Sequence, residues 1–392
     1  MYRFDQEEKD AIWRVIESGW LFRYGGEPAN LHQVDEFESR FARRMQASHA
    51  VAVTSGTAAL ICGLAGLGIG PGDEVIVPGY TFIATASAVV EARAVPIIAE
   101  IDETLTLDIE DVRRKITPRT KAIIPVHMAG VPANLGPILE LAQEHGLYVV
   151  EDACQAVGGS YQGKPLGSLG HVGAFSLNFY KIIGTGEGGA AITSDRGVYD
   201  RMRMHHDTGV SFWGSDMPAD TPVIPGVNYR MSELLGAFAL VQLGRLDGFV
   251  ENMCAIKKRI YGMLEGTPRA APQNDPDGDC GTTLHFQFDS VDQAVRYQAQ
   301  LEDQGVSSSR PINTGRHVYS NWEFVINRTN ICEQGCSWDC PRYKGEANYA
   351  PDMCPNTLDI LARTVAVSTD PFWTPDQVNV LADKLDVAAR AL

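Results

Sequence analysis

The chain has 392 residues, of which 44% are hydrophobic and 21% are charged, a composition typical of a folded globular protein and not of a disordered one. This length is enough for two ordinary domains and a large hydrophobic core. The formal net charge of −16 argues against nucleic acid or an anionic membrane as a partner, so local hydrogen-bond donors have to hold any anionic ligand.

The sequence shows no targeting signal, and its cysteines form no disulfide pattern. No apolar stretch approaches the ~20 residues that a membrane-spanning helix needs. Residues 1–20 lack the basic start and apolar core of a signal peptide. The cysteines are scattered, and Cys62 and Cys154 stand in apolar runs, as reduced thiols do. We therefore expect a cytoplasmic protein without membrane contacts.

The first segment with a chemical signal is VTSGTAALICGLAGLG, residues 53–68, in which Ser55, Gly56 and Thr57 stand where a helix is expected to begin. Free N–H groups and hydroxyls at the positive end of a helix dipole suit a phosphate. Ser and Thr are also ordinary N-caps, which is the simpler interpretation of this segment taken alone.

Strand-like and helix-like segments alternate between about residues 50 and 195. Apolar runs rich in Val and Ile occur at 74–79, 94–101, 121–128 and 148–154, and a helical pattern that ends on a glycine occupies 137–146. Runs that are hydrophobic on both faces predict a parallel sheet covered by helices. Such sheets bind ligands beyond the carboxyl ends of their strands.

Two single residues of this region could carry chemistry. Asp152 stands where the strand at 148–151 is expected to end, so it could pair with a protonated ring nitrogen, or it could be a buried or capping aspartate. Lys181 lies between an apolar run and a glycine-rich turn in FSLNFYKIIGTGEGG. It could be an exposed turn residue, a phosphate ligand or a nucleophilic amine.

The pattern changes past residue 230, close to a polar motif. GVNYRMSE, residues 226–233, offers Asn228 and Arg230 either as polar loop residues or as anion donors. One long helix or two successive helices are expected over 232–264, followed by a Gly-, Pro- and Asp-rich loop at 266–281. A strand at 282–288, a helix at 291–304, an irregular polar stretch to about 354 and a closing helix at 376–390 predict a smaller α+β unit.

The order of these signals is more informative than each signal alone. An anion-binding helix start is followed by a strand-end Asp152 and, about thirty residues later, by Lys181, all within one parallel-sheet region. A phosphate cradle, a ring-nitrogen partner and a Schiff-base lysine are the three groups that pyridoxal 5′-phosphate needs. We therefore predict a site for this cofactor.

Six motifs occur in the order TSGTAAL, PGYTFIATASAV, ITPRTKAIIPVHMAG, VEDACQAVG, FSLNFYKIIGTGEGGAAIT and VNYRMSELLGAFALVQLGRLD. Together they closely resemble the DegT/StrS family of sugar and cyclitol aminotransferases, strongly over residues 10–250 and loosely beyond. The resemblance implies an α/β fold of the aspartate-aminotransferase type with a mostly parallel central sheet. It also implies a large cofactor-binding domain, 1–250, and a smaller α+β domain, 251–392.

The resemblance assigns a role to each matching residue. Lys181 would hold pyridoxal phosphate covalently and then move a proton, and Asp152 would pair with the ring nitrogen. Gln155 would face the ring or its phenolic oxygen, and Phe82 would stack on the ring. The phosphate would be bound by Gly56, Thr57 and Ser176. Asn228 would reach the phosphate of the neighbouring subunit, which implies a homodimer with shared sites. The substrate contacts suggested are His127, Tyr180 and Arg230.

The implied activity moves an amino group from L-glutamate or L-glutamine to a keto-sugar or keto-cyclitol, in antibiotic or glycan biosynthesis. Lys181 argues against the dehydratase relatives, which carry His there. Phrases such as PVHMAG and CPNT also resemble 3-amino-5-hydroxybenzoate synthases, which leaves elimination or aromatisation of a cyclic ketone as an alternative. A non-catalytic, ligand-binding relative is a second alternative. The run of residues 176–181 departs from the common family pattern, so the acceptor stays open.

The C-terminal part carries cysteines at 332, 336, 340 and 354. Their spacing is not that of a usual zinc or iron–sulfur site, so we predict no metal and expect a reduced, partly buried loop near the substrate entrance. Aromatic residues of this part could cover the substrate or pack the small domain, and we favour packing. They are Trp322, Trp338, Tyr343 and Tyr349.

Overall fold

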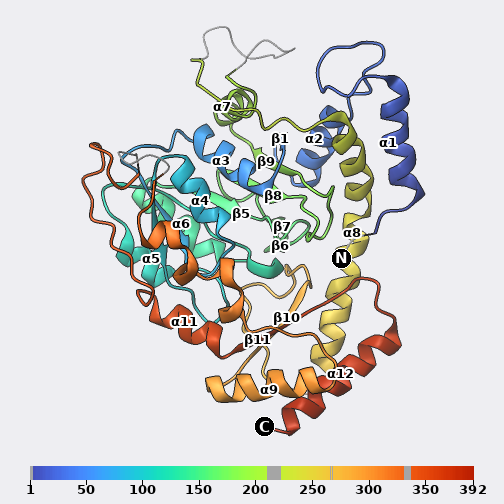
Figure 1. Cartoon of the computed structure of the whole chain (residues 1–392), viewed down its shortest axis with the longest axis vertical. Coiled ribbons are helices and arrows are strands. Elements are labelled where there is room, and N and C mark those ends of the chain that lie inside the picture. Colours follow the sequence, from blue (N-terminus) through green and yellow to red (C-terminus); the bar gives the residue numbers. More distant parts are fainter. Residues whose placement is uncertain (1–2, 210–221, 265, 267, 331–336) are drawn as a thin grey trace.

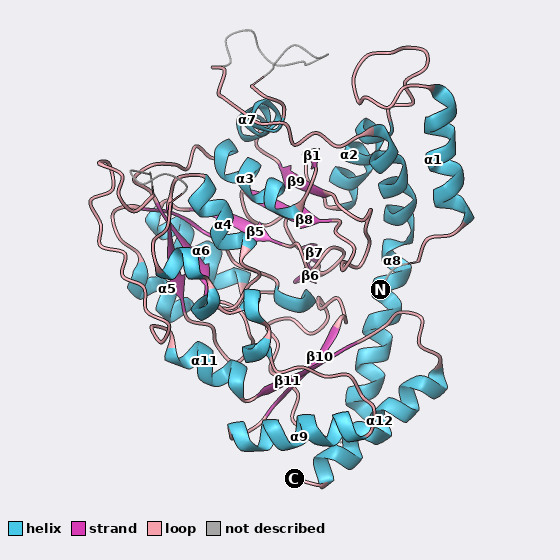
Figure 2. Ribbon diagram, in the orientation of Figure 1, coloured by secondary structure: helices cyan, strands magenta, loops and turns pink. Residues whose placement is uncertain are grey.

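The structure is a computed structural model that describes residues 3–209, 222–264, 266, 268–330 and 337–392. A seven-stranded sheet lies between layers of helices, and a smaller unit of two strands and two helices lies at the end of the molecule that holds the C-terminus (Figure 1, Figure 2). In the described part of the chain, no helix combines the length and the apolar character needed to cross a bilayer.

The central sheet has the strand order β1-β9-β8-β5-β4-β2-β3. Strand β9 is antiparallel to both of its neighbours, and all other pairs are parallel, which confirms the predicted parallel sheet. Strand β4 ends earlier than predicted, because Pro125 has no N–H to donate to a neighbouring strand. The strands are β1 (His49–Val53), β2 (Glu74–Pro78), β3 (Val95–Ala99), β4 (Thr120–Ile123), β5 (Tyr148–Asp152), β8 (Val172–Ser176) and β9 (Gly189–Thr193).

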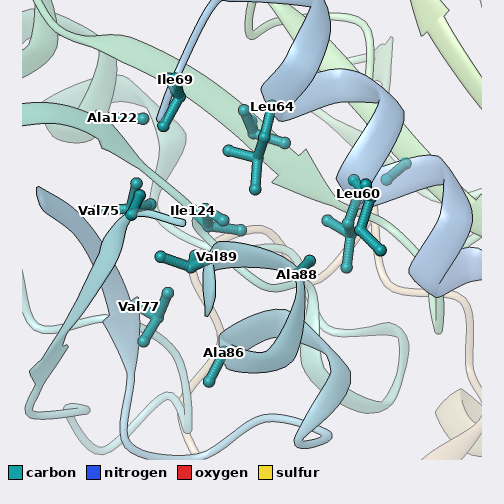
Figure 3. Packing of buried hydrophobic residues seen from close by; sticks show 14 of the residues in the cluster. Leu60, Leu64, Ile69, Val75, Val77, Ala86, Ala88, Val89, Ala122 and Ile124 are labelled. Carbon is teal, nitrogen blue, oxygen red and sulfur yellow. The ribbon is translucent and has the colours of Figure 1, made fainter. Parts of the chain in front are cut away.

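Alternate side chains of the strands enter two different cores. Val75 and Val77 of β2 pack with Leu60 and Leu64 of α3 and with α4, as Figure 3 shows, whereas Ile76 packs with α5 and α6 on the opposite face. Helix α3 is buried and apolar on all sides, as expected for a helix inside the fold. These helices are α3 (Gly56–Gly66), α4 (Ala84–Glu91), α5 (Ile109–Lys115) and α6 (Leu135–His145).

The remaining helices of the large unit lie around the β1 edge and α8. Helix α2 packs Phe37 and Phe41 against β1 and β9 residues, α1 packs on α8 through Ala11 and Val15, and α7 packs on α3. The sequence patterns did not predict α1, α2 or α7. The bounds are α1 (Gln6–Ser18), α2 (Gln33–Arg44), α7 (Arg196–His206) and a short hairpin of β6 (Ser160–Tyr161) and β7 (Lys164–Pro165).

Helix α8 (Glu233–Met263) is one continuous helix that runs from the large unit into the small one (Figure 1). There it packs with α9 (Val291–Asp303), α12 (Pro375–Arg390) and the antiparallel pair β10 (Thr283–Gln287) and β11 (Thr364–Ser368). The predicted strand and the two predicted helices of this unit are confirmed to within two residues. The division at residue 250 stays a prediction, because α8 passes that point without a break.

The C-terminal stretch before β11 differs from the prediction in where it packs. Trp322, Trp338 and Tyr343 join the core of the central sheet, and Tyr343 and Tyr349 donate hydrogen bonds to Glu74 Oε1 (3.0 Å) and Pro96 O (2.6 Å). Glu74 and Pro96 are at the amino ends of β2 and β3, so residues 338–349 lie on the large unit, away from the carboxyl ends. The expectation that the 331–340 cysteine loop lies near the substrate entrance is wrong for Cys340, which packs in this same core. Elements α10 (Glu323–Ile326) and α11 (Pro355–Ala362) were not predicted.

The other cysteines of that stretch fall into two groups. Cys354 is buried beside Lys115, whereas Cys332 and Cys336 lie outside the described residues. No group of three His, Cys, Asp or Glu side chains in the described ranges is arranged to hold a metal ion.

Candidate active site

A cavity of about 570 Å³ opens where the carboxyl ends of β1, β5 and β8 meet. Its volume is in the range of small-molecule sites. The structure brings together there all the residues predicted to bind the cofactor except Asn228, and one predicted substrate contact. These are Gly56, Thr57, Phe82, Asp152, Gln155, Ser176, Tyr180 and Lys181.

The beginning of α3 forms the anion-binding side of the cavity. Ser55 is the N-cap, and its Oγ accepts a hydrogen bond from Ala58 N (3.0 Å). Within the described chain, no acceptor faces the N–H groups of Gly56 and Thr57, so both donors are available at the positive end of the helix. A Cβ on Gly56 would lie 2.8 Å from Ser176 Cβ, so only glycine lets the helix approach the end of β8 this closely.

Asp152 ends β5 and is 5% exposed. Its Oδ2 accepts a hydrogen bond from Thr85 Oγ1 (2.7 Å), and its Oδ1 accepts one from Cys154 N (3.1 Å). Two donors thus hold a buried carboxylate at the cavity wall, where it can accept a further bond from a cationic N–H. Burial raises the pKa of the Cys154 thiol well above its usual value, and the Asp152 carboxylate adds to the effect, so this thiol is neutral.

Lys181 follows β8 in a tight loop and is half-buried. Its N–H donates to Asn178 O (3.0 Å), and Phe179 N donates to Gly186 O (2.9 Å). Gly186 has φ +86°, a left-handed conformation that glycine adopts without strain. The glycine-rich turn therefore closes the loop and directs the Lys181 side chain into the cavity.

Gln155 and Phe82 are two further predicted cofactor contacts that line the cavity. Gln155 Oε1 accepts a hydrogen bond from Ala129 N (3.1 Å), so the other end of its amide is the end that can donate. The Phe82 ring lies before α4 with its centroid 5.4 Å from that of His317.

Two side chains that line the cavity were not predicted from the sequence, the Arg316 guanidinium and the His317 imidazole. Their segment pairs with the end of β2, because Thr81 N donates to His317 O (3.0 Å) and Ile83 N to Arg316 O (2.9 Å). Burial lowers the pKa of His317, and the Lys181 ammonium lowers it further, so its imidazole is neutral at neutral pH. Two adjacent basic side chains in a strongly acidic chain were the one available signal.

His127, a suggested substrate contact, does not line the cavity and is fully buried. Its Nδ1 accepts from Ala133 N (3.1 Å), so its Nε2 carries the proton and donates to Glu151 Oε2 (3.1 Å). The packing therefore gives His127 a structural role beneath the site, and the suggested substrate contact is not supported in this chain.

Asn228 and Arg230 lie outside this cavity, beside the end of β1, where Arg230 bridges to Val53. Asn228 is exposed, and its Oδ1 accepts from Arg230 N (3.2 Å). The Arg230 guanidinium pairs with the buried Asp207 carboxylate and lies 5.4 Å from the Phe22 ring centroid. Neither side chain reaches the site of its own chain.

The residues present fit pyridoxal phosphate. The helix start and the hydroxyls of Thr57 and Ser176 supply donors for a phosphate, the Asp152 carboxylate suits a protonated ring nitrogen, and the Lys181 amine suits an aldehyde. The close approach at Gly56 keeps these donors within one small cavity.

Comparison with known proteins agrees with the site. The model of the DegT/DnrJ/EryC1/StrS aminotransferase family matches residues 3–386. A GDP-perosamine synthase from Caulobacter vibrioides is 40% identical over 268 residues, 67% of this chain and 67% of that protein. The Bacillus subtilis spore coat polysaccharide biosynthesis protein SpsC is 32% identical and covers 95% of this chain and 92% of its own. The structure of a 3-amino-5-hydroxybenzoic acid synthase is 27% identical, with a TM-score of 0.81 over 100% of this chain and 98% of that one, and confirms the predicted fold class.

Proposed function

The chain belongs to the DegT/DnrJ/EryC1/StrS aminotransferase family, and we propose that it uses pyridoxal phosphate to transfer an amino group from L-glutamate or L-glutamine to a keto-sugar. The convergence of the predicted cofactor residues other than Asn228 on one cavity is the observation that carries this proposal. A relative at 40% identity is a GDP-perosamine synthase, which supports a nucleotide-linked keto-sugar as the acceptor and glycan biosynthesis as the process.

The side chains of the cavity have distinct tasks in such a reaction. Bound pyridoxal phosphate supplies an electron sink for the bonds of the carbon that carries the nitrogen. Lys181 would hold the cofactor, and its Nζ would move the proton at the substrate carbon. Asp152, held by Thr85 and Cys154 N, would pair with a protonated ring nitrogen, and the α3 start would bind the phosphate. The neutral imidazole of His317 offers a hydrogen bond without adding charge.

A homodimer with shared sites is part of the proposal. Trp13 of α1 is 58% exposed and Leu21 is 46% exposed, so large apolar side chains are available for a contact with a second copy. Leu21 O accepts from Glu233 N (3.1 Å), and Phe22 lies beside Arg230, whose N–H donates to Asn228, so the surface at Leu21 and Phe22 is near the exposed Asn228. A second copy covering it would bring Asn228 toward the partner's phosphate site. We also propose a cytoplasmic location for this dimer.

Aromatisation of a cyclic ketone is the second candidate, and the match to a 3-amino-5-hydroxybenzoic acid synthase favours it. Both candidates use the same cofactor groups, so they differ in the fate of the substrate. A keto-cyclitol as the acceptor and antibiotic biosynthesis as the process are alternatives within the same proposal. A non-catalytic role is disfavoured, because Lys181, Asp152 and the α3 start are all present in one cavity.

Visible spectroscopy of the purified protein tests the proposal. We expect a visible band with bound pyridoxal phosphate that bleaches on addition of L-glutamate or L-glutamine and is absent or shifted in Lys181→Ala. Transfer is then followed by mass spectrometry with a panel of nucleotide-linked keto-sugars and keto-cyclitols. Bleaching by neither amino donor would favour the aromatisation candidate, and a band that is identical in Lys181→Ala would refute the role of Lys181.

A further inference from the structure

A backbone turn outside the cavity holds the side chain of Gln155. Ala129 has φ 51° and ψ 33°, a left-handed conformation that is strained for a residue with a Cβ, and Gly130 follows with φ 82°. This conformation directs Ala129 N to Gln155 Oε1 at 3.1 Å. Because an N–H can bond only to an oxygen here, the orientation of the Gln155 amide is determined, and its NH₂ group is the end left for the cavity.

Residues 280–282, just before β10, form a clamp: they hydrogen-bond to this turn from the side of the small unit. Thr282 Oγ1 donates to Ala129 O, and Cys280 N donates to Gly130 O (3.0 Å). Thr282 is 6% exposed, so its hydroxyl bond is shielded from water. A Cβ on Gly130 would lie 2.9 Å from both Cys280 Cβ and Thr282 Oγ1, which shows how closely the two segments meet.

The clamp is itself anchored to α8. Asp279 forms a buried ion pair with Lys257 of α8 (Nζ–Oδ2 2.7 Å) and accepts from Gly281 N. Gly281 has φ 73°, and a Cβ there would collide with the backbone at Met253 of α8. The position of Thr282 is therefore set by the rigid helix that joins the two units.

We infer that Thr282 is a positioning residue for the cofactor site. It holds the strained Ala129 turn, and the turn holds Gln155 with its NH₂ group as a donor to the cavity. In the described part of the chain no acceptor faces Gln155 Nε2, so the bound molecule provides one. This inference rests on the proposed function, because the donor is assigned to pyridoxal phosphate.

A double-mutant cycle on the full-length protein tests this inference. The dissociation constant of pyridoxal phosphate is measured by absorbance titration for the wild type, Thr282→Val, Gln155→Met and the double variant. We expect Thr282→Val to weaken binding about 3- to 10-fold, as the loss of one hydrogen bond does. In the Gln155→Met background the same change should have no further effect, because its target is gone.

Controls separate the positioning role from general destabilisation. Thr282→Ser keeps the hydroxyl and should bind the cofactor as the wild type does. Thr364 of β11 has another buried hydroxyl, which donates to Ile360 O of α11 at 2.6 Å. Thr364→Val removes this hydroxyl and should leave cofactor binding unchanged. Thr282→Ala replaces the Val variant if that variant does not fold.

The outcomes are distinguishable from those of the proposed function. Failure of the wild type to bind pyridoxal phosphate would refute the proposed function and the inference with it. Normal wild-type binding with an unaffected Thr282→Val, or with equal losses in both backgrounds of the cycle, would refute the positioning role alone.

Discussion

Substitution of Glu151 is the most direct test of the buried hydrogen-bond network that lies beneath the site. Glu151 is fully buried in β5, next to Asp152. Its Oε1 accepts from the N–H groups of Leu169 (2.7 Å) and Gly170 (2.6 Å), and its Oε2 accepts from Gly167 N (2.7 Å) and from His127 Nε2. Four donors are thus directed at two oxygens.

The change Glu151→Gln keeps the shape and replaces one oxygen with an NH₂ group. In either amide orientation, that NH₂ group faces two N–H donors. His127 cannot compensate by moving its proton, because its Nδ1 already accepts from Ala133 N. An unsatisfied buried donor costs about 1–3 kcal/mol, so two of them lower the free energy of unfolding by about 2–6 kcal/mol. Removal of a buried charge offsets part of this loss, which favours the lower half of the range.

Urea denaturation followed by tryptophan fluorescence measures the loss, with Glu144→Gln as the control. Glu144 is 62% exposed and 3.5 Å from Arg113, so its change should alter stability by less than about 0.5 kcal/mol. If Glu151→Gln lowers the free energy of unfolding by less than about 1 kcal/mol, the hydrogen-bond network assigned to Glu151 is wrong. A His127→Leu variant with normal stability and a raised KM would restore the suggested substrate contact and refute the structural role.

Two further predictions concern acid stability and the α3 start. Burial, as the main cause, lowers the pKa of His206 and of His285 to about 3, below the 6.5 of an unfolded histidine, so their neutral forms stabilise the fold above pH 6.5. This stability is lost as the pH falls from 6.5 toward 3, by about 4 kcal/mol in total at pH 5, and a urea midpoint unchanged between pH 7 and 5 would contradict it. Gly56→Ala should force α3 away from Ser176, cost about 1–3 kcal/mol and weaken pyridoxal phosphate binding, as measured by thermal denaturation and titration. The matched change Gly248→Ala, at an exposed position of α8 with open space around it, should stabilise the helix by up to about 1 kcal/mol, and equal effects of the two changes would refute the close-approach argument.

The sequence by itself determined four adjacent strands of the central sheet, β5-β4-β2-β3, and the chemistry at the carboxyl edge. Runs of Val and Ile predicted β2 to β5 because a parallel strand buried on both faces has to be apolar throughout. Asp152 and Lys181 could be assigned because the carboxyl ends of parallel strands meet at one edge, so residues distant in the chain converge there. The motif resemblance added Phe82, Gln155 and Ser176, which also line the cavity.

Only the tertiary structure decided which further side chains lie in the cavity at that edge and which do not. His127 carries the same motif signal as its neighbours, yet packing turns it toward Glu151, and Arg316 enters the cavity from a stretch without periodicity. Residues 338–349 pack on the amino ends of β2 and β3, and β11 pairs with β10 across a long loop. These contacts join segments that are far apart in the chain. Which segments pack together depends on the shape and the unpaired polar groups of surfaces that exist only after folding, whereas periodicity describes each segment alone.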